Sequence, residues 1–483
     1  MNASATPATM ARNSGTMRSR SLLPLTLISA AIYPDSPVQL AIIVVYKNIN
    51  ADFKEFMREL TVEFKKIVGE GKALGRLDGK VVFCYGVLPD ETAKVRAVVE
   101  KRNFIEAELI EILTPSPKRV APKEDHYLSC SPWQVMDYAF QCETKKNIIE
   151  DLLYQTTKET IKLDKFYGAE KTFGYRTKIE YSFTGEAGKL SFAFHKRGNY
   201  REKYLLPAGC ALISPEANAV AVKILETLNT LNLSTSDLKT LIIREAKNPG
   251  SRVAALYMKR DDIPLPDMVF EGLDGFLAIY SNPISSVSQV DGIIKSWGND
   301  FVTEELLGSK FSYGFDCFFQ NNIELFTEAL KEIRAASFKC SKLVDLYSGV
   351  GVIGLTLRDL ADKVVAVEAA QNSAKYAPLN AQANGASNFE MVCSMSEKTD
   401  EGLFDGTDII VLDPPRAGLH TKVIKRIMEI LPKRVIYLSC NPITQGRDAA
   451  FFLEKYKIVR SAGFDFYPNT PHAETLLVFE REK

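Results

Sequence analysis

The sequence predicts an α/β protein whose C-terminal part is an open, doubly wound parallel sheet, preceded by a small β-barrel and a mixed α+β segment. Four short unbroken apolar runs point to this sheet, at residues 343–347, 364–367, 409–412 and 435–438. They alternate with helical stretches such as 373–383 and 423–431, a rhythm typical of parallel strands buried on both faces. Two last runs, 458–466 and 475–480, predict a closing antiparallel pair.

Residues 57–116 have the pattern of a small all-β barrel. Short alternating apolar runs are separated by turn residues, and Asp78-Gly79 between two such runs is a strong hairpin signal. Further strands are expected at 81–85, 95–99 and 107–112. Barrels of this size commonly bind oligonucleotides, although as many simply pack against a neighbouring domain.

Residues 117–305 read as a mixed α+β domain, and residues 306–483 as the doubly wound domain. A helix is expected at 135–155, followed by antiparallel strands at 176–183 and 190–195. Basic residues interleave with Tyr200 and Tyr204 just beyond these strands, a pattern suited to phosphate contacts and base stacking. From composition alone, a solvated strand edge that Lys and Arg protect from aggregation is the favoured interpretation.

Composition limits the chemistry that the chain can carry. The 483 residues include 60 Lys and Arg against 60 Asp and Glu, so no overall basic field indicates a nucleic-acid partner, although a local basic face would suffice. The eight cysteines contain no C-x-x-C pair, and only four histidines are present. These counts predict no protein metal site, and scattered free thiols suit a reducing, cytoplasmic location.

Residues 1–56 differ from the rest of the chain and are interpreted as a leader that is disordered or not native to the folded protein. The first 34 residues contain Arg12, Arg18 and Arg20 but no acidic residue. A targeting peptide fits this composition, but translated upstream sequence is favoured, with Met57 as the working start, because Met57 directly precedes the first segment with the pattern of a folded unit. No uncharged apolar run is long enough for a membrane-spanning helix.

Polar or reactive residues follow each of the four parallel strands. In chain order these are Gly349-x-Gly351-x-x-Gly354, Glu368, Asp413-Pro414-Pro415-Arg416 and Cys440. Because ligands of open α/β sheets bind beyond the carboxyl ends of the strands, these features are expected to converge on one site. The glycine turn with Glu368 fits a dinucleotide or S-adenosylmethionine. The Asp-Pro-Pro element favours a base-modifying methyltransferase, because a nicotinamide dehydrogenase has no need of it.

Cys440 is a candidate nucleophile and Glu474 a candidate base. Carbon 5 of uracil becomes nucleophilic when a thiolate adds to carbon 6, and a base must later remove the carbon 5 proton. A cysteine that ends a strand is more often a small core residue, and a carboxylate in a hairpin is more often a solvated charge. The position of Cys440 beside Asp413 favours the catalytic interpretation.

Taken together, these motifs resemble the S-adenosylmethionine-dependent RNA uridine-C5 methyltransferases of the TRAM-containing, rRNA type. The matching segments are 77–91 (LDGKVVFCYGVLPDE), 116–122 (SPKRVAP), 174–178 (GYRTK), 318–322 (FFQNN), 345–349 (DLYSG), Glu368, 413–416 (DPPR), 439–442 (SCNP) and 471–474 (PHAE). The resemblance covers residues 60–483 and implies a TRAM barrel, a central RNA-contacting domain and a Rossmann-like methyltransferase domain.

The resemblance also implies roles for individual residues. Cys440 would be the nucleophile and Glu474 the proton acceptor, while Arg176 and Lys178 would contact RNA. S-adenosylmethionine would be bound by Gln320, Tyr347, Gly349, Gly351, Glu368 and Asp413. Many relatives also hold an iron–sulfur cluster through a C-x5-C-x2-C run and a later cysteine. Here Cys130 stands alone, with Cys210 as a match to the distant ligand, so neither a cluster nor another metal is expected.

The target expected from the resemblance is one uridine of 23S-type large-subunit rRNA, because relatives with a TRAM barrel mostly modify rRNA. Methylation of tRNA is the alternative, and an RNA-binding or assembly protein without turnover is another. A third interpretation, a nicotinamide-dependent oxidoreductase, is supported only by the glycine turn together with Glu368. A monomer without membrane association is expected.

Overall fold

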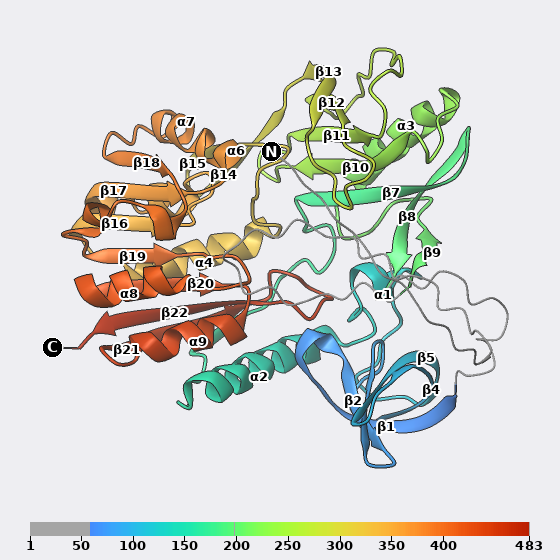
Figure 1. Ribbon diagram of the computed structural model, residues 1–483, viewed down its shortest axis with the longest axis horizontal. Helices are drawn as coiled ribbons and strands as arrows, with labels where there is room; N and C mark the ends of the chain where they lie inside the picture. The colour runs from blue at the N-terminus through green and yellow to red at the C-terminus, as the bar shows by residue number, and fades with distance from the viewer. Residues whose placement is uncertain (1–57, 198, 483) are drawn as a thin grey trace, which may run out of the picture. The chain divides into compact units, whose positions relative to one another are not determined.

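The computed structural model describes residues 58–197 and 199–482, except for the side chains of residues 199–201 (Figure 1). The proposed leader, residues 1–56, and the side chains of Tyr200 and Arg201 therefore lie outside the described residues. Within the described part of the chain, no helix is long and apolar enough to cross a membrane.

The N-terminal strands form a closed barrel in the order β1-β2-β3-β5-β4. Their bounds are β1 (Glu59–Ile67), β2 (Ala73–Leu77), β3 (Lys80–Cys84), β4 (Glu91–Glu100) and β5 (Phe104–Thr114). The β2–β3 hairpin turns at Asp78 and Gly79, whose φ angles of 49° and 78° are the positive values that a two-residue turn requires. Phe64, Val82 and Val95 fill the barrel interior. The predicted barrel and hairpin are confirmed.

The middle of the chain forms a seven-stranded sheet in the order β13-β12-β11-β10-β7-β8-β9. Its strands are β7 (Lys178–Glu186), β8 (Lys189–Lys196), β9 (Asn199–Leu205), β10 (Leu238–Glu245), β11 (Arg252–Met258), β12 (Gly275–Tyr280) and β13 (Gly292–Gly298). Helix α3 (Pro215–Thr230) begins at Ser214, whose hydroxyl accepts a hydrogen bond from the amide of Ala217, and it packs on β8 and β10. A short hairpin, β14 (Phe301–Leu306) and β15 (Ser309–Gly314), leads into the C-terminal domain.

The C-terminal domain contains the doubly wound sheet, in the order β18-β17-β16-β19-β20-β22-β21-β6 (Figure 1). Its strands are β6 (Lys165–Tyr167), β16 (Cys340–Leu346), β17 (Ala361–Glu368), β18 (Phe389–Cys393), β19 (Ile409–Leu412), β20 (Arg434–Ser439), β21 (Tyr456–Phe464) and β22 (Glu474–Arg481). The first five strands of that order are parallel, and β22 pairs antiparallel with both β20 and β21. The predicted parallel sheet and its closing antiparallel pair are confirmed.

Both faces of this sheet are covered by helices. Within β19, Ile409 and Val411 face one hydrophobic core, while Ile410 and Leu412 face the other. Helices α4 (Ile323–Ala336) and α5 (Val352–Thr356) belong to the first core. The second core holds residues of α2 (Tyr138–Thr157), α8 (Thr421–Ile430) and α9 (Pro442–Phe452). Burial on both faces explains why the strand sequences are unbroken apolar runs.

The helix predicted at residues 373–383 is two helices, α6 (Gln371–Ala374) and α7 (Tyr376–Ala383). Pro378 lies in the first turn of α7 and has no amide hydrogen to donate to the carbonyl of Ala374. A proline is tolerated in the first turn of a helix but interrupts a longer one, which explains the break.

Two elements from the middle of the sequence join the C-terminal sheet instead of the central one. Strand β6 pairs parallel with β21, and α2 packs along α9. The expectation of one domain over residues 117–305 did not include this exchange, and the domain boundaries themselves stay a prediction. Helix α2 thereby becomes the support of the connection between β21 and β22, residues 465–473.

Buried polar contacts fix that connection to α2. The ammonium of Lys145 forms an ion pair with Asp465 and donates to the carbonyl oxygen of Tyr467 at 3.1 Å. Gln141 donates to Asn469 Oδ1 at 3.0 Å and accepts from the Asn469 amide at 2.9 Å. Lys145 and Asp465 are 1% and 0% exposed, so each charge depends on the other for compensation.

Replacing Lys145 with methionine is expected to lower the free energy of unfolding by about 3–5 kcal/mol, because it leaves the Asp465 carboxylate buried without its cation. Urea denaturation followed by circular dichroism measures this change. Lys331→Met, which removes the exposed Lys331–Glu328 pair, is the control and is expected to change stability by less than about 1 kcal/mol. Equal effects of the two substitutions would contradict the role assigned to Lys145.

Candidate active site

The carboxyl ends of β16, β17, β19 and β20 open onto a cavity of about 710 Å³. Seven of the eight residues predicted to be catalytic or cofactor-binding line it, namely Gln320, Tyr347, Gly349, Glu368, Asp413, Cys440 and Glu474. The eighth, Gly351, does not line the cavity; it precedes α5 with a φ of 89°. The structure therefore brings residues from six separate segments of the sequence into one site.

The turn after β16 is shaped by backbone conformation and by Glu368. Tyr347 and Gly349 have φ angles of 62° and 56°. The amides of Gly349 and Ala370 donate to the two carboxylate oxygens of Glu368, at 2.9 and 2.7 Å. Each oxygen retains a further acceptor position, so Glu368 is held in place and can still accept hydrogen bonds from a ligand.

Gln320 and Asp413 form a polar pair in the wall of the cavity. Gln320 Nε2 donates to Asp413 Oδ2 at 3.3 Å. Burial raises the pKa of Asp413 to about 7, and the hydrogen bond from Gln320 opposes this rise. Gln320 Oε1 is buried and has no hydrogen-bond partner among the described residues. An unsatisfied acceptor at the wall of a cavity is suited to a ligand that carries a donor.

The loop that carries Gln320 is fixed by a buried arginine. The guanidinium of Arg244 donates to the carbonyl oxygens of Phe315 and Cys317 at 3.1 and 2.5 Å. Thr177 Oγ1 donates to the carbonyl oxygen of Gln320 at 3.1 Å. These contacts hold Gln320 from the side of the central sheet, and Arg244 was not identified from the sequence.

Cys440 lies in the turn between β20 and α9. Asn441 caps α9 by accepting from the amide of Ile443 at 3.2 Å, and its Nδ2 donates to the carbonyl oxygen of Arg416 at 2.9 Å. The cysteine turn is thereby tied to the Asp-Pro-Pro-Arg turn. Burial and the negative charges of Glu474 and Asp413 raise the pKa of the Cys440 thiol to about 12, while Arg416 lowers it.

Glu474 is the first residue of β22 and faces the same cavity. Its side chain is 2% exposed, and its Oε2 has no hydrogen-bond partner in the described part of the chain. Burial and the nearby Asp413 raise the pKa of Glu474 well above its usual range, and Arg416 opposes them. A thiol and a buried carboxyl group on one cavity can together perform nucleophilic addition and proton removal.

The lining residues that were not singled out as site residues from the sequence include Arg416, Tyr467 and His472. Arg416 Nη2 lies 3.4 Å from His472 Nδ1. Burial and the charge of Arg416 lower the pKa of His472 to about 4, so the imidazole is neutral near pH 7. Arg416 is then the cation of the cavity wall. The position of Arg416 directly after Asp-Pro-Pro was the sequence feature that could have identified it as a site residue.

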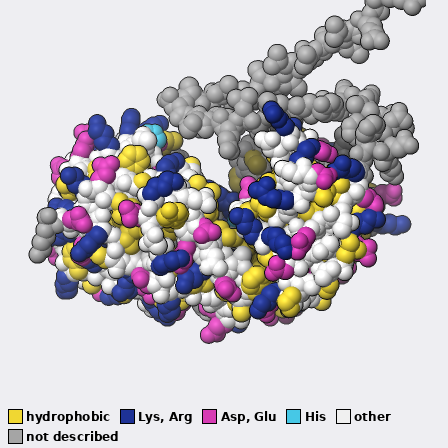
Figure 2. Space-filling model, turned by 90° about the horizontal axis from the view of Figure 1, so that it is seen from below, with side chains coloured by type: hydrophobic (Ala, Val, Ile, Leu, Met, Phe, Trp, Pro, Cys, Tyr) yellow, Lys and Arg dark blue, Asp and Glu magenta, His cyan; other side chains and the backbone are white. Residues whose placement is uncertain are grey.

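Arg176 and Lys178 line a different cavity, of about 470 Å³, together with Cys130 and Cys210. Near it, Lys196 pairs with Glu202 and lies 5.2 Å from the ring centre of Tyr204. Lys and Arg side chains are interspersed with Asp and Glu over the face that Figure 2 presents, in keeping with the zero net charge. The RNA-contacting roles of Arg176 and Lys178 stay a prediction.

This chain is similar in sequence to RNA methyltransferases. Residues 284–482 match the profile of the tRNA (uracil-5-)-methyltransferase family. An uncharacterised RNA methyltransferase of Caldanaerobacter subterraneus subsp. tengcongensis is 28% identical over 87% of this chain and 98% of its own length. One from Clostridium tetani is 28% identical over 85% of this chain and 93% of its own length.

The fold also has a match among solved structures. The crystal structure of Pyrococcus abyssi tRNA (uracil-54, C5)-methyltransferase in complex with S-adenosyl-L-homocysteine superimposes with a TM-score of 0.72 at 22% identity. The similarity covers 87% of this chain and 100% of that one. The predicted architecture, a small barrel followed by a mixed domain and a doubly wound domain, is thereby confirmed.

Proposed function

Because residues 284–482 match the tRNA (uracil-5-)-methyltransferase family, we propose that this chain transfers a methyl group from S-adenosylmethionine to carbon 5 of a uridine in RNA. The observation that carries the proposal is the single cavity on which Cys440, Glu474, Asp413 and Gln320 meet. In the proposed reaction, the Cys440 thiolate adds to carbon 6 of uracil and the electron pair at carbon 5 then takes the methyl group. Removal of the carbon 5 proton by Glu474 expels the thiolate and restores the double bond.

The same cavity supports a proposed binding mode for S-adenosylmethionine. The carboxylate of Glu368, oriented by two backbone amides, is suited to accept hydrogen bonds from the ribose hydroxyl groups. Gln320 and Asp413 offer a free amide oxygen and a carboxyl oxygen to the same cavity. Tyr347, Gly349 and Gly351 shape the turn that approaches the ligand. S-adenosylmethionine supplies the electrophilic methyl group when it is bound.

Glu368→Ala is expected to weaken S-adenosylhomocysteine binding roughly 10- to 100-fold, because hydrogen bonds to a charged group contribute about 1.5–3 kcal/mol. Isothermal titration calorimetry measures the dissociation constant, with Glu390→Gln, an exposed residue paired with Lys363, as the control. Unchanged affinity in Glu368→Ala would contradict the assignment. Thermal stabilisation by NAD but not by S-adenosylhomocysteine would instead support the oxidoreductase alternative.

For the RNA substrate we propose large-subunit rRNA, with tRNA as the alternative. The preference for rRNA rests on the barrel, yet the similarity to the P. abyssi enzyme, which by its name acts on tRNA, covers 87% of this chain. Residues 117–483 alone would not reach that share, so the aligned part extends into residues 1–116. This similarity is the reason for keeping tRNA as the alternative substrate.

The experiment that tests the proposed function uses the full chain with S-adenosylmethionine and unmodified transcripts of 23S-type rRNA and of tRNA. Mass spectrometry of the digested RNA is expected to detect 5-methyluridine in one of them, and sequencing locates it. 5-Methyluridine in tRNA only would overturn the rRNA substrate. Its absence from both, with intact S-adenosylhomocysteine binding, would favour the RNA-binding or assembly alternative.

A further inference from the structure

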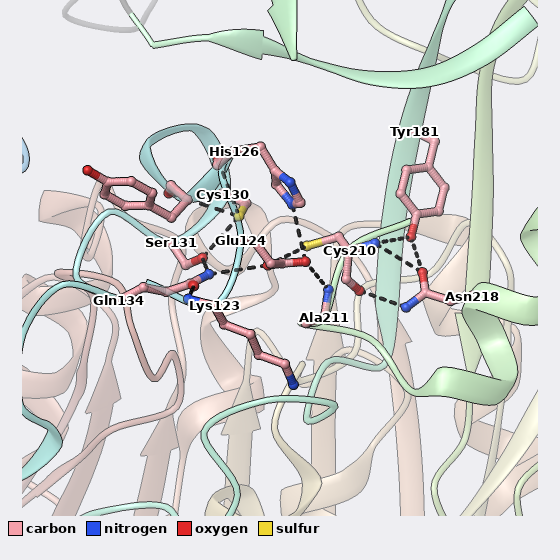
Figure 3. A network of polar contacts seen from close by, with 11 residues as sticks. Lys123, Glu124, His126, Cys130, Ser131, Gln134, Tyr181, Cys210, Ala211 and Asn218 are labelled. Atoms are coloured by element: carbon pink, nitrogen blue, oxygen red, sulfur yellow. Dashed lines mark hydrogen bonds and ion pairs between the residues drawn. The ribbon is translucent and has the colours of Figure 1, made fainter. Parts of the chain in front are cut away.

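A second cluster of reactive side chains lies outside the candidate active site, where the segment after the barrel meets the central sheet (Figure 3). Glu124, His126, Cys130 and Cys210 each point one donor atom toward a common point, and these atoms all lie within 4.8 Å of one another. Three of them come from the segment around α1 (Tyr127–Cys130), and Cys210 comes from the loop between β9 and α3.

The backbone holds these donors in position. His126 and Cys130 are four residues apart on one helical turn, a spacing that places both side chains on the same side. Cys210 is held at both backbone groups, since its amide donates to Asn218 Oδ1 at 3.1 Å and its carbonyl oxygen accepts from Asn218 Nδ2 at 2.8 Å. Cys210 is 1% exposed and His126 is 7% exposed.

The polar atoms of this cluster do not all have a close hydrogen-bond partner among the described residues. His126 Nε2 is buried and lies 3.4 Å from Glu124 Oε1, yet it makes no hydrogen bond to any described residue. Cys210 Sγ lies 3.9 Å from Glu124 Oε2. Buried polar groups that face one another without a strong bond are unfavourable unless another group joins them.

The carboxylate of Glu124 is oriented by neighbours that are not themselves ligands. The amide of Ala211 donates to its Oε1 at 2.6 Å, and Gln134 Nε2 donates to its Oε2 at 3.2 Å. Gln134 Nε2 also donates to Ser131 Oγ at 2.7 Å, and Ser131 Oγ lies 3.0 Å from Cys130 Sγ. Outer hydrogen bonds of this kind are how metal sites fix their ligands (Figure 3).

We propose that Glu124, His126, Cys130 and Cys210 bind one zinc ion. Two sulfurs, one imidazole nitrogen and one carboxylate oxygen are a zinc donor set, and zinc bonds of about 2.0–2.3 Å place tetrahedral ligands roughly 3.3–3.8 Å apart. The 3.4 Å between His126 and Glu124 already falls in that range. An iron–sulfur cluster needs more thiolates than the two offered here.

This proposal replaces the expectation that the chain holds no metal, which followed from Cys130 being alone in its segment. Four protein ligands leave no open position, so the ion is structural. It would tie residues 124–130 to the loop at Cys210, in the wall of the cavity that Arg176 and Lys178 line. The proposal does not depend on the proposed function.

The test uses the full-length protein purified under reducing conditions. Elemental analysis is expected to find about one zinc per chain and no stoichiometric iron or sulfide. Cobalt(II) exchanged into the wild-type chain is expected to give intense tetrahedral visible bands and a near-ultraviolet thiolate-to-cobalt band. X-ray absorption of the zinc protein should report two sulfur and two nitrogen or oxygen neighbours.

Variants identify the ligands. Cys130→Ser and Cys210→Ser are each expected to weaken zinc binding at least about 100-fold in a chelator competition, while Cys393→Ser, at an exposed cysteine, leaves it unchanged. A cobalt spectrum without thiolate bands in the wild-type chain, stoichiometric iron with sulfide, or a Cys130–Cys210 disulfide in the anaerobically purified protein would each overturn the proposal. The wild-type measurements decide the matter even if a variant fails to fold.

Discussion

Replacing Cys440 with alanine is expected to reduce methyl transfer to RNA at least roughly 10,000-fold, because loss of a nucleophile removes the covalent route altogether. The dissociation constant for S-adenosylhomocysteine should change by less than about twofold, because in the proposed mechanism Cys440 bonds to the uracil base and not to the cofactor. The measurement is single-turnover transfer of a labelled methyl group to the RNA transcript that the wild-type chain methylates.

A second measurement makes the covalent step visible. With RNA that contains 5-fluorouridine, methyl transfer leaves carbon 5 carrying both fluorine and methyl, and fluorine cannot be removed as a proton is. The thiolate is then unable to leave, so a protein–RNA adduct should survive denaturing electrophoresis. The adduct should form only with S-adenosylmethionine present and only with Cys440 intact.

The pH dependence follows from the surroundings of the thiol. Because burial and the nearby carboxyl groups raise the pKa of Cys440 to about 12, the free protein holds the thiol protonated near pH 7. The thiolate fraction therefore rises with pH throughout the range below 12, and adduct formation should accelerate from pH 6 to pH 9. Cys393→Ala, at an exposed cysteine, should match the wild type. An adduct formed by Cys440→Ala would contradict the assignment.

The candidate site was predictable where it follows from strand ends. Apolar runs fix where each parallel strand stops, and the carboxyl ends of neighbouring parallel strands lie at one edge. Glu368, Asp413 and Cys440 could therefore be assigned to one cavity from the sequence alone. Gln320 lies in a loop before α4, and only the resemblance, not periodicity, pointed to it.

Contacts between distant segments could not be predicted in this way. Lys145 in α2 faces Asp465, 320 residues further along the chain, and no local pattern encodes that pairing. The cluster at Cys130 could not be predicted for the same reason. The spacing of His126 and Cys130 is visible in the sequence, but the position of Cys210 beside them depends on how the central sheet folds. Arg176 and Lys178 likewise line the cavity that Cys130 and Cys210 share, and not the candidate active site.

Glu474→Gln is expected to slow multiple turnover roughly 100- to 10,000-fold and to trap ordinary RNA on the enzyme. The amide keeps the volume of the side chain but cannot take the carbon 5 proton, so methyl transfer proceeds and release of Cys440 does not. A labelled methyl group should then migrate with a protein–RNA adduct on a denaturing gel, without any fluorinated base.

Burial moves the titration of Glu474 to a higher pH than that of an exposed carboxylate. Burial and the nearby Asp413 raise the pKa of Glu474, so its base form grows as pH rises through a range higher than that of an ordinary carboxyl group. Release of methylated RNA by the wild type should therefore accelerate with pH, while the adduct of Glu474→Gln should persist at every pH. Glu482→Gln, at an exposed position, serves as the matched control. Wild-type turnover by Glu474→Gln with no adduct would mean that another group removes the proton, and Asp413, whose pKa burial raises to about 7, would be the next to test.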